Sequence, residues 1–267
     1  MGALEDSCSF LSYSSKYFLL NNGLKVVFLP TPDTDVLALQ MWVKTGSIHE
    51  GRFLGSGISH FVEHMVFKGT NKRTYADIFK ETQAQGAKIN AYTSFDRTVY
   101  TYDGCTNSLD TGLDILGDML CGSVFPEEEL IKERDVILRE IDMSNDDPDD
   151  RLSQLLFENA FQQHPYHYPI IGIRSIFESL TRKDLIAYWQ ERYAINNMIL
   201  IVAGNLDVFC LKKKVEKYLG HYLPKSVAPV YIPQEPFQLA ERFAYESGDY
   251  QLTRGAVAFK IPGVGHK

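Results

Sequence analysis

One short segment constrains this chain more than any other. In residues 57–68, apolar side chains recur every three or four positions, a spacing that predicts an amphipathic helix. The segment contains His60-Phe-Val-Glu63-His64. Because positions i and i+4 of a helix lie one turn apart on the same face, both imidazoles can reach one metal ion. The helix is therefore predicted to present two metal ligands, with Glu63 beside them.

These residue types suit zinc. A catalytic zinc ion takes three ligands from the protein, neutral imidazole nitrogen among them, and keeps one position open. A carboxylate next to such an ion can take a proton from the attacking water. The spacing HxxEH is the inverse of the commoner HExxH zinc motif. The alternative is an amphipathic helix with two histidines on its solvated side, and the motif as a whole favours the metal site.

A third ligand has two candidates. Residues 126–143 are predicted to form a long helix, on which Glu133 and Glu140 lie two turns apart on the same face. Their neighbours on that face are apolar, and buried carboxylates are costly unless a metal or a partner satisfies them. Taken alone, the pair is better explained by a solvated helix edge. Taken with the histidines, one glutamate as ligand and the other supporting the site is the better interpretation.

The remaining pattern predicts an α+β fold, a mostly antiparallel sheet with helices packed on it. The chain opens with a hairpin, Tyr17–Leu20 and Leu24–Leu29, around the turn Asn21-Asn22-Gly23. Further strands are expected at residues 36–44 and 197–203 and, as a pair turning near 94–97, within 88–103. Further helices are expected at residues 74–85, 108–120, 149–162, 181–193 and 207–219.

The composition changes after residue 221. Residues 222–236 carry four prolines and no helical period, which is typical of a linker. We expect an N-terminal tail (1–14), a catalytic domain (15–221), a linker (222–245) and the first strand region of a second, truncated domain (246–267), with a strand at Thr253–Ile261. One strand cannot make a domain. The chain is therefore expected to be the N-terminal portion of something longer.

Charge and composition exclude several classes of protein. The net charge of −7 gives no reason to bind nucleic acid, and 45% hydrophobic residues exclude a mainly disordered chain. No apolar run is long enough to span a membrane. The first residues do not read as a secretory signal. We therefore expect a cytoplasmic location, or a periplasmic or organellar one if a leader has been removed.

Several segments together resemble a known family. Gly55–Thr70, with Glu140 following 76 residues after His64, looks like the pitrilysin/insulysin family of zinc peptidases, which includes the mitochondrial and bacterial processing peptidases. Residues 133–141, 86–93 and 196–207 also fit. The resemblance covers about residues 15–266, and its motifs are highly specific in combination.

The resemblance implies a role for each candidate residue. One Zn²⁺ per chain would be held by His60, His64 and Glu140, with Glu63 as general base and Glu133 as the carboxylate that supports the site. Asn90 and Ala91 would hold the substrate backbone, because the family binds peptides as an extra strand on a sheet edge. From the residue pattern alone, an internal strand is the favoured interpretation of residues 88–93.

The function expected is that of a zinc metalloendopeptidase acting on short or unfolded polypeptides. The family is built from repeated domains, so the expected partners are the remaining homologous domains, in the same longer chain or in a partner subunit. The rival hypothesis is a non-catalytic assembly or peptide-binding subunit of the same fold. Such a subunit is expected to lack one of His60, Glu63, His64 or Glu140, and all four are present.

Overall fold

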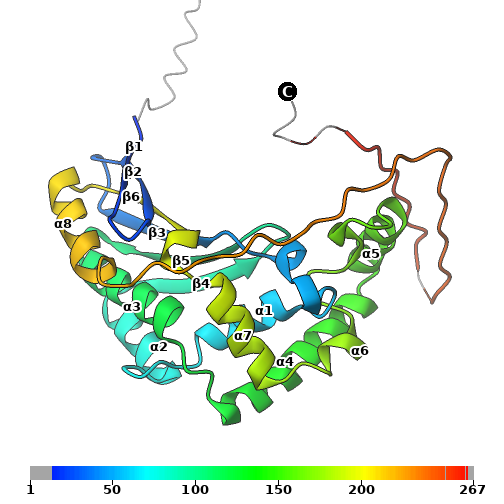
Figure 1. The fold of residues 1–267 in the computed structure, drawn as a ribbon, viewed down its shortest axis with the longest axis horizontal. Coiled ribbons are helices and arrows are strands. Elements are labelled where there is room, and N and C mark those ends of the chain that lie inside the picture. The colour runs from blue at the N-terminus through cyan, green and yellow to red at the C-terminus, as the bar shows by residue number, and fades with distance from the viewer. Residues whose placement is uncertain (1–13, 250, 262, 264–267) are drawn as a thin grey trace, which may run out of the picture.

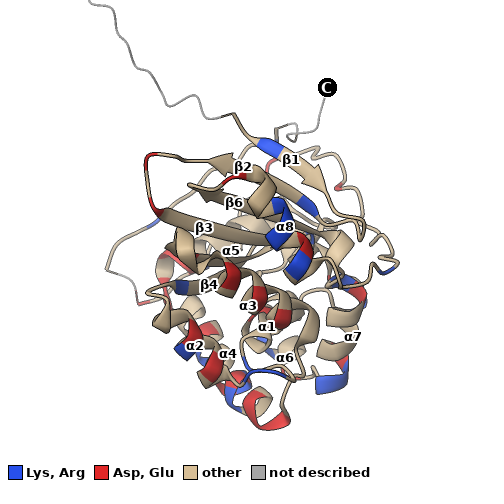
Figure 2. Ribbon diagram, turned by 90° about the vertical axis from the view of Figure 1, so that its left-hand side faces the viewer, with Lys and Arg blue, Asp and Glu red and all other residues tan. Residues whose placement is uncertain are grey.

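A six-stranded sheet with helices beneath it organises residues 16–219 (Figures 1 and 2). The structure is a computed structural model that describes residues 14–249, 251–261 and 263. The strand order is β1-β2-β6-β3-β5-β4. The strands are β1 (Lys16–Leu19), β2 (Lys25–Pro30), β3 (Val36–Val43), β4 (Lys88–Thr93), β5 (Thr98–Cys105) and β6 (Met198–Gly204).

The sheet is mostly antiparallel, as predicted. Only β2 and β6 run parallel, and every other neighbouring pair is antiparallel. The β1–β2 hairpin turns at Gly23, whose φ of +84° is in the left-handed region that favours glycine. Parallel neighbours need a long crossover. Here the crossover from β2 to β6 contains β3 to β5 and seven of the helices.

The predicted helices are present, with ends shifted by a few residues. Thr74 and Asp77 form the capping box that their spacing predicts. The short α6 and the 3-10 turns η1–η5 were not predicted. The helices are α1 (Ile58–Val66), α2 (Tyr75–Ala84), α3 (Leu109–Gly122), α4 (Glu127–Asp146), α5 (Pro148–Ala160), α6 (Arg174–Phe177), α7 (Arg182–Arg192) and α8 (Val208–Leu219). The turns are η1 (Ser47–His49), η2 (Gly51–Phe53), η3 (Thr106–Ser108), η4 (Pro165–His167) and η5 (Ile195–Asn197).

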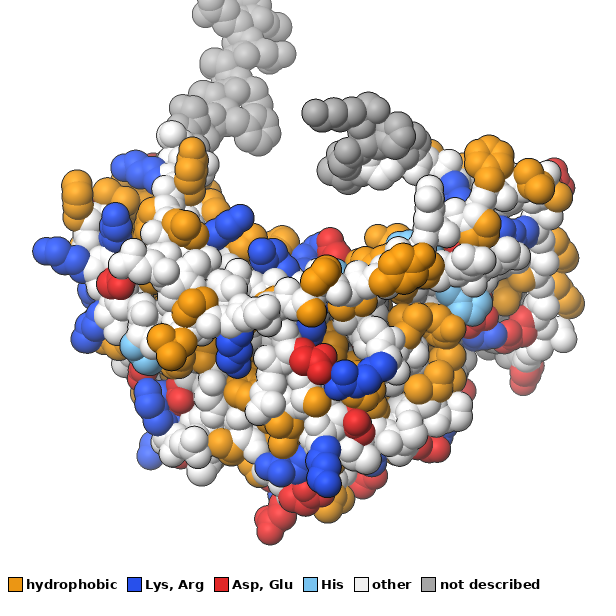
Figure 3. Space-filling model, viewed as in Figure 1, with side chains coloured by type: hydrophobic (Ala, Val, Ile, Leu, Met, Phe, Trp, Pro, Cys, Tyr) orange, Lys and Arg blue, Asp and Glu red, His pale blue; other side chains and the backbone are white. Residues whose placement is uncertain are grey.

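The core lies between the sheet and the helices below it (Figure 2). Along β3 every second side chain is buried, including Leu37, Leu39 and Met41, as expected for a sheet with one face packed on a core. Figure 3 shows that the upper side of the molecule is hollowed between the β1–β2 end of the sheet and α5. No helix in the described part of the chain is long and apolar enough to cross a membrane.

After α8 the chain runs across the molecule towards α5 as an extended segment (Figure 1). From residue 220 onwards the described residues contain neither helix nor strand. Side-chain hydrogen bonds tie the segment down. Arg192 donates to the Ala228 carbonyl at 2.8 Å, and Arg242 donates to the Ala160 carbonyl at 2.9 Å. The carboxylate of Glu235 accepts from the backbone N–H groups of Gln162, Gln163 and His164.

The strand predicted at Thr253–Ile261 was wrong for this structure. The described residues there form no strand, and Val257, Phe259 and Ile261 are more than four-fifths exposed. A strand is stable only when a neighbour supplies hydrogen bonds, and no described strand lies beside this segment. Residues 262 and 264–267 of the predicted second domain, and residues 1–13 of the predicted tail, lie outside the described residues.

Candidate metal centre

The helix α1 is buried except at its two histidines. Seven of its nine residues are buried, and only His60 and His64 are not. Their ring centroids are 4.6 Å apart, as two residues one turn apart on a helix require. Because α1 is covered by its neighbours α4, α7 and β4, it is not the surface helix with a solvated histidine face that was considered as the alternative.

Glu140 of α4 faces this pair. Its Oε2 lies 3.9 Å from Nε2 of His60 and 3.7 Å from Nε2 of His64. One ligand atom from each residue lies within 4.8 Å of the others, and this is the one such group found among the described residues. A tetrahedral zinc ion with bonds of about 2.0–2.2 Å holds its ligands roughly 3.4 Å apart. The three side chains thus fit a zinc ion after small movements.

Glu133, seven residues before Glu140 on α4, contacts His64 on the side away from Glu140. Nδ1 of His64 donates to Oε2 of Glu133 at 3.0 Å, and the other oxygen, Oε1, lies 2.5 Å from Nζ of Lys68. Burial opposes ionisation of Glu133, but the bonds from His64 and Lys68 outweigh it and lower the pKa of this carboxyl. Burial likewise opposes protonation of His64, yet Glu133, Glu140 and Glu63 together raise its pKa.

His60 is in a different environment. Its Nδ1 is buried, and no hydrogen-bond partner for it occurs in the described part of the chain. Burial lowers the pKa of His60 to about 3, and the neighbouring His64 adds to this effect. The ring is therefore neutral at pH 7, which is the form that binds a metal ion. The neutral ring turns its other nitrogen, Nε2, towards Glu140, as a zinc ligand would.

Glu63 lies beside the three converging residues and is held by the sheet. It is 7% exposed, and Oγ1 of Thr93, the last residue of β4, donates to its Oε2 at 2.5 Å. Burial raises the pKa of Glu63, and the hydrogen bond from Thr93 partly offsets this. A carboxyl whose pKa is raised above its ordinary value accepts a proton more readily, which suits proton transfer. Nothing in the sequence pattern identified Thr93 or Lys68 beforehand.

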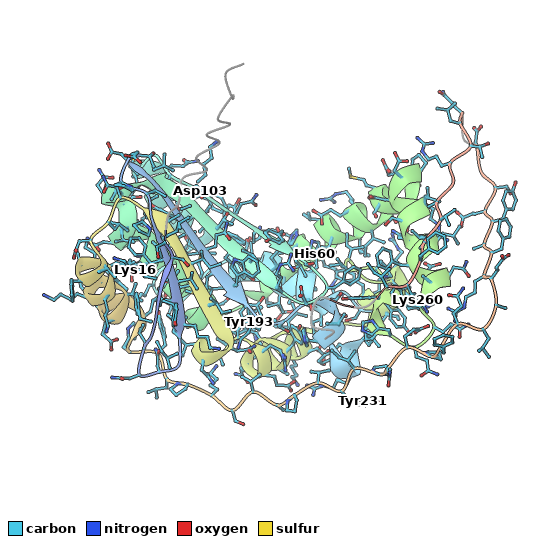
Figure 4. All side chains as sticks on the ribbon, turned by 90° about the horizontal axis from the view of Figure 1, so that it is seen from above. Lys16, His60, Asp103, Tyr193, Tyr231 and Lys260 are labelled. Carbon is cyan, nitrogen blue, oxygen red and sulfur yellow. The ribbon has the colours of Figure 1, made fainter. Side chains whose placement is uncertain are left out.

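Asn90 and Ala91 lie at the free edge of the sheet. The strand β4 pairs on one side with β5, where Asn90 faces Thr101 and Ala91 faces Tyr100, and it is the last strand in the sheet. The edge position implied by the family resemblance is thus found, and the internal strand favoured by the residue pattern alone was wrong. Seen from above, His60 lies near the middle of the molecule, between the sheet and the region of α5 (Figure 4).

The start of α1 is fixed by close backbone contact. Gly57 and Gly172 both have left-handed φ values, +69° and +93°, and a Cβ on Gly57 would lie 2.1 Å from the carbonyl oxygen of Ile171. The loop before α6 therefore crosses the first turn of α1 with no room for a side chain. Next to this crossing, Oε1 of the buried Glu50 accepts from the backbone N–H of Ser59 at 3.0 Å.

Residues 25–174 match the family model described as insulinase (peptidase family M16), and residues 179–267 match that of the peptidase M16 inactive domain. Because the first match covers more than half of the chain, the chain belongs to peptidase family M16, and the resemblance inferred from the motifs is confirmed.

Two curated relatives show the extent of the match. An uncharacterized zinc protease, YmxG, of Bacillus subtilis (strain 168) is 36% identical over 214 residues, which are 80% of this chain and 52% of that protein. The mitochondrial-processing peptidase subunit beta of Lentinula edodes is 32% identical over 253 residues, 92% of this chain and 53% of that protein. The chain thus spans about half the length of the curated relatives it matches.

Solved structures give the same picture. A protease from Helicobacter pylori superposes with a TM-score of 0.79 at 28% identity, over 84% of this chain and 55% of that one. The periplasmic protease PqqL from Escherichia coli gives a TM-score of 0.77 at 26% identity, over 85% of this chain and 26% of that one. The α+β fold predicted from the sequence is therefore an M16 fold, and the relatives support a peptidase-type function.

Proposed function

We propose that this chain carries the catalytic domain of a zinc metalloendopeptidase that cleaves short or unfolded polypeptides. The main support is that one ligand atom from each of His60, His64 and Glu140 lies within 4.8 Å of the others. The buried Glu63 lies beside these three residues. We propose that His60, His64 and Glu140 hold one zinc ion per chain. A peptidase site of this kind needs three protein ligands and one base, and the chain supplies both.

Zinc, when bound, supplies a Lewis acid for the peptide carbonyl and a nucleophilic water at neutral pH. Glu63 then takes the proton from the attacking water and delivers it to the nitrogen of the departing amine. Its hydrogen bond from Thr93, 2.5 Å long, holds the carboxyl towards the sheet while it does so. Glu133 keeps the proton of His64 on Nδ1, so that Nε2 is free to bind the ion.

The substrate is proposed to bind along the outer edge of β4, near Asn90 and Ala91. An edge strand presents unpaired backbone groups, to which an extended peptide can add as a further strand. Such binding uses hydrogen bonds to the backbone of the substrate and requires that the substrate be extended. This is why the proposed substrates are short or unfolded polypeptides.

The whole protein's activity involves more than these residues. Since the chain spans about half of its curated relatives, we propose a catalytic domain at 15–221, a linker at 222–245 and the beginning of a second domain at 246–267. The remaining homologous domains, in the same longer chain or in a partner subunit, are the proposed partners of this domain. A cytoplasmic location stays a prediction.

The rival function is a non-catalytic assembly or peptide-binding subunit. The match of residues 179–267 to the inactive-domain model is the observation in its favour. That match begins after the last candidate site residue, Glu140, and so does not bear on the metal centre.

Cleavage of an internally quenched peptide library, with and without a chelator, tests the proposal. We expect chelator-sensitive cleavage and about one zinc per chain by elemental analysis. Glu140→Gln should lose both. Glu128→Gln, an exposed position on the same helix, is the matched control and should lose neither. A folded chain that binds zinc but cleaves nothing, in an assay where a known zinc peptidase cleaves the same library, would favour the peptide-binding role.

A further inference from the structure

Lys68 lies two residues beyond the end of α1, the helix that carries both histidines. Its backbone N–H donates to the Met65 carbonyl at 3.0 Å, in the turn that follows Val66, the last residue of α1. His64 and Lys68 are four residues apart in the sequence. Glu133 of α4 faces both of them, and each of its oxygens has one partner.

The lysine is confined more than a surface lysine would be. Its side chain is 14% exposed, and that of Glu133 is 10% exposed. The ammonium nitrogen also lies 4.5 Å from the ring centroid of Tyr75, the first residue of α2, close enough for a cation–π contact. Two contacts from different elements thus fix where the ammonium group lies, and the ammonium group in turn fixes Oε1 of Glu133.

Only one of the two histidines is oriented in this way. Nδ1 of His64 donates to Glu133, whereas the buried Nδ1 of His60 has no partner among the described residues. Among the described residues, a hydrogen bond that sets ring orientation and the nitrogen carrying the proton is therefore found only at His64, and it comes from Glu133. A carboxylate held at both oxygens cannot rotate away from the imidazole.

We propose that Lys68 is a positioning residue for the metal centre. It anchors Oε1 of Glu133, so that Oε2 stays on Nδ1 of His64 and Nε2 of His64 is presented to zinc. The proposal rests on the proposed function, in that zinc is taken as the ion at the site. Three side chains, Lys68, Glu133 and His64, then form a continuous series of contacts that ends at the nitrogen proposed to bind zinc.

Zinc affinity is the quantity to measure, by competition with a chelating indicator and without any peptide. Outer partners of this kind are typically worth about 10–100-fold in metal affinity, so Lys68→Met should weaken zinc binding by about 10-fold. Lys72→Met is the matched control, because Lys72 is nearby in sequence, 58% exposed and 3.9 Å from Asp114. It should leave the affinity unchanged. The visible spectrum of the cobalt-loaded chain should change for Lys68→Met only.

A double-mutant cycle separates positioning from packing. In a Glu133→Gln background, Lys68→Met should cause little further loss of zinc affinity, because both substitutions break the same chain of contacts. An undiminished further loss would overturn the proposal, as would an unchanged affinity for Lys68→Met alone. Zinc bound without peptide cleavage would overturn only the proposed function, and a wild-type chain that binds no zinc would overturn both.

Discussion

The hydroxyl of Thr93 donates a 2.5 Å hydrogen bond to Oε2 of Glu63. Thr93 ends the edge strand β4, and Glu63 lies on α1, the helix that carries His60 and His64. The bond therefore fixes the proposed base relative to the strand along which the peptide is proposed to bind. A shift of the base by one ångström can cost a large factor in rate, so this contact has a direct consequence for turnover.

Thr93→Val should lower kcat with little effect on zinc binding. A hydrogen bond to a charged group contributes about 1.5–3 kcal/mol, which corresponds to a loss of about 10–100-fold if the bond acts in the transition state. Thr93→Ser keeps the hydroxyl and should retain most of the activity. Steady-state kinetics with a quenched peptide distinguish the two. Equal activity of the valine and serine variants would remove Thr93 from this role.

Glu63→Gln should abolish peptide cleavage while zinc remains bound. Removal of a general base typically costs about 10²–10⁴ in rate, and glutamine preserves the shape of the side chain and its acceptor for Thr93. Elemental analysis and a cleavage assay on the same sample are the required measurements. Retained turnover would mean that another group takes the proton, and lost zinc would mean that Glu63 is itself a ligand.

Much of the fold was predictable because it depends on local pattern. The 3-to-4 spacing located α1, the Thr74–Asp77 pair located the start of α2, and the Asn-Asn-Gly turn located the first hairpin. The strand at Thr253–Ile261 was wrong although its residues favour β structure, because a strand also needs a neighbour. The four-residue α6 is too short to produce a helical period.

The part of the candidate site that was predictable consists of residues that lie close together in the sequence or share a helical spacing. His60, Glu63 and His64 stand in one motif. The spacing on a second helix offered both Glu133 and Glu140, and only the family resemblance pointed to Glu140 as the ligand. Lys68 and Thr93 were missed because their contacts are tertiary. Lys68 contacts Glu133, and Thr93 contacts Glu63. The two partners in each pair are too far apart in the sequence for helix or strand periodicity to link them. Lysine and threonine are common residues, and neither type by itself marks a functional site.

Glu50 should make the stability of the folded chain fall as pH rises. Burial raises the pKa of Glu50 from 4.5 to about 8, against the opposing hydrogen bonds from Ser59. Between these values the folded chain binds one more proton than the unfolded chain. The contribution of Glu50 is therefore complete below pH 4.5 and is lost as pH rises through 8, with a slope of about 1.4 kcal/mol per pH unit in between.

Glu50→Gln should remove this slope, since glutamine does not ionise and still offers an oxygen to the Ser59 N–H. Urea unfolding of the chain in the presence of a chelator, at several values between about pH 5 and 8, measures it. The exposed Glu128→Gln variant should show the same pH dependence as the wild type. Parallel curves for wild type and Glu50→Gln would mean that Glu50 ionises as easily in the folded chain as in the unfolded one.

Gly57→Ala should destabilise the fold at the start of α1, the helix that carries His60 and His64. Alanine at a φ of +69° carries the usual cost of the left-handed region, and its Cβ would also lie 2.1 Å from the Ile171 carbonyl oxygen. The matched control is Gly86→Ala, since Gly86 has a similar φ of +64° with nothing within 4 Å of the added carbon. The control should cost about 1 kcal/mol, the left-handed conformation alone. Gly57→Ala should cost at least about 2 kcal/mol more, because backbone on both sides of the crossing must move. Urea unfolding of both variants measures the two losses of unfolding free energy. Equal losses would show that the crossing is loose enough to take a methyl group.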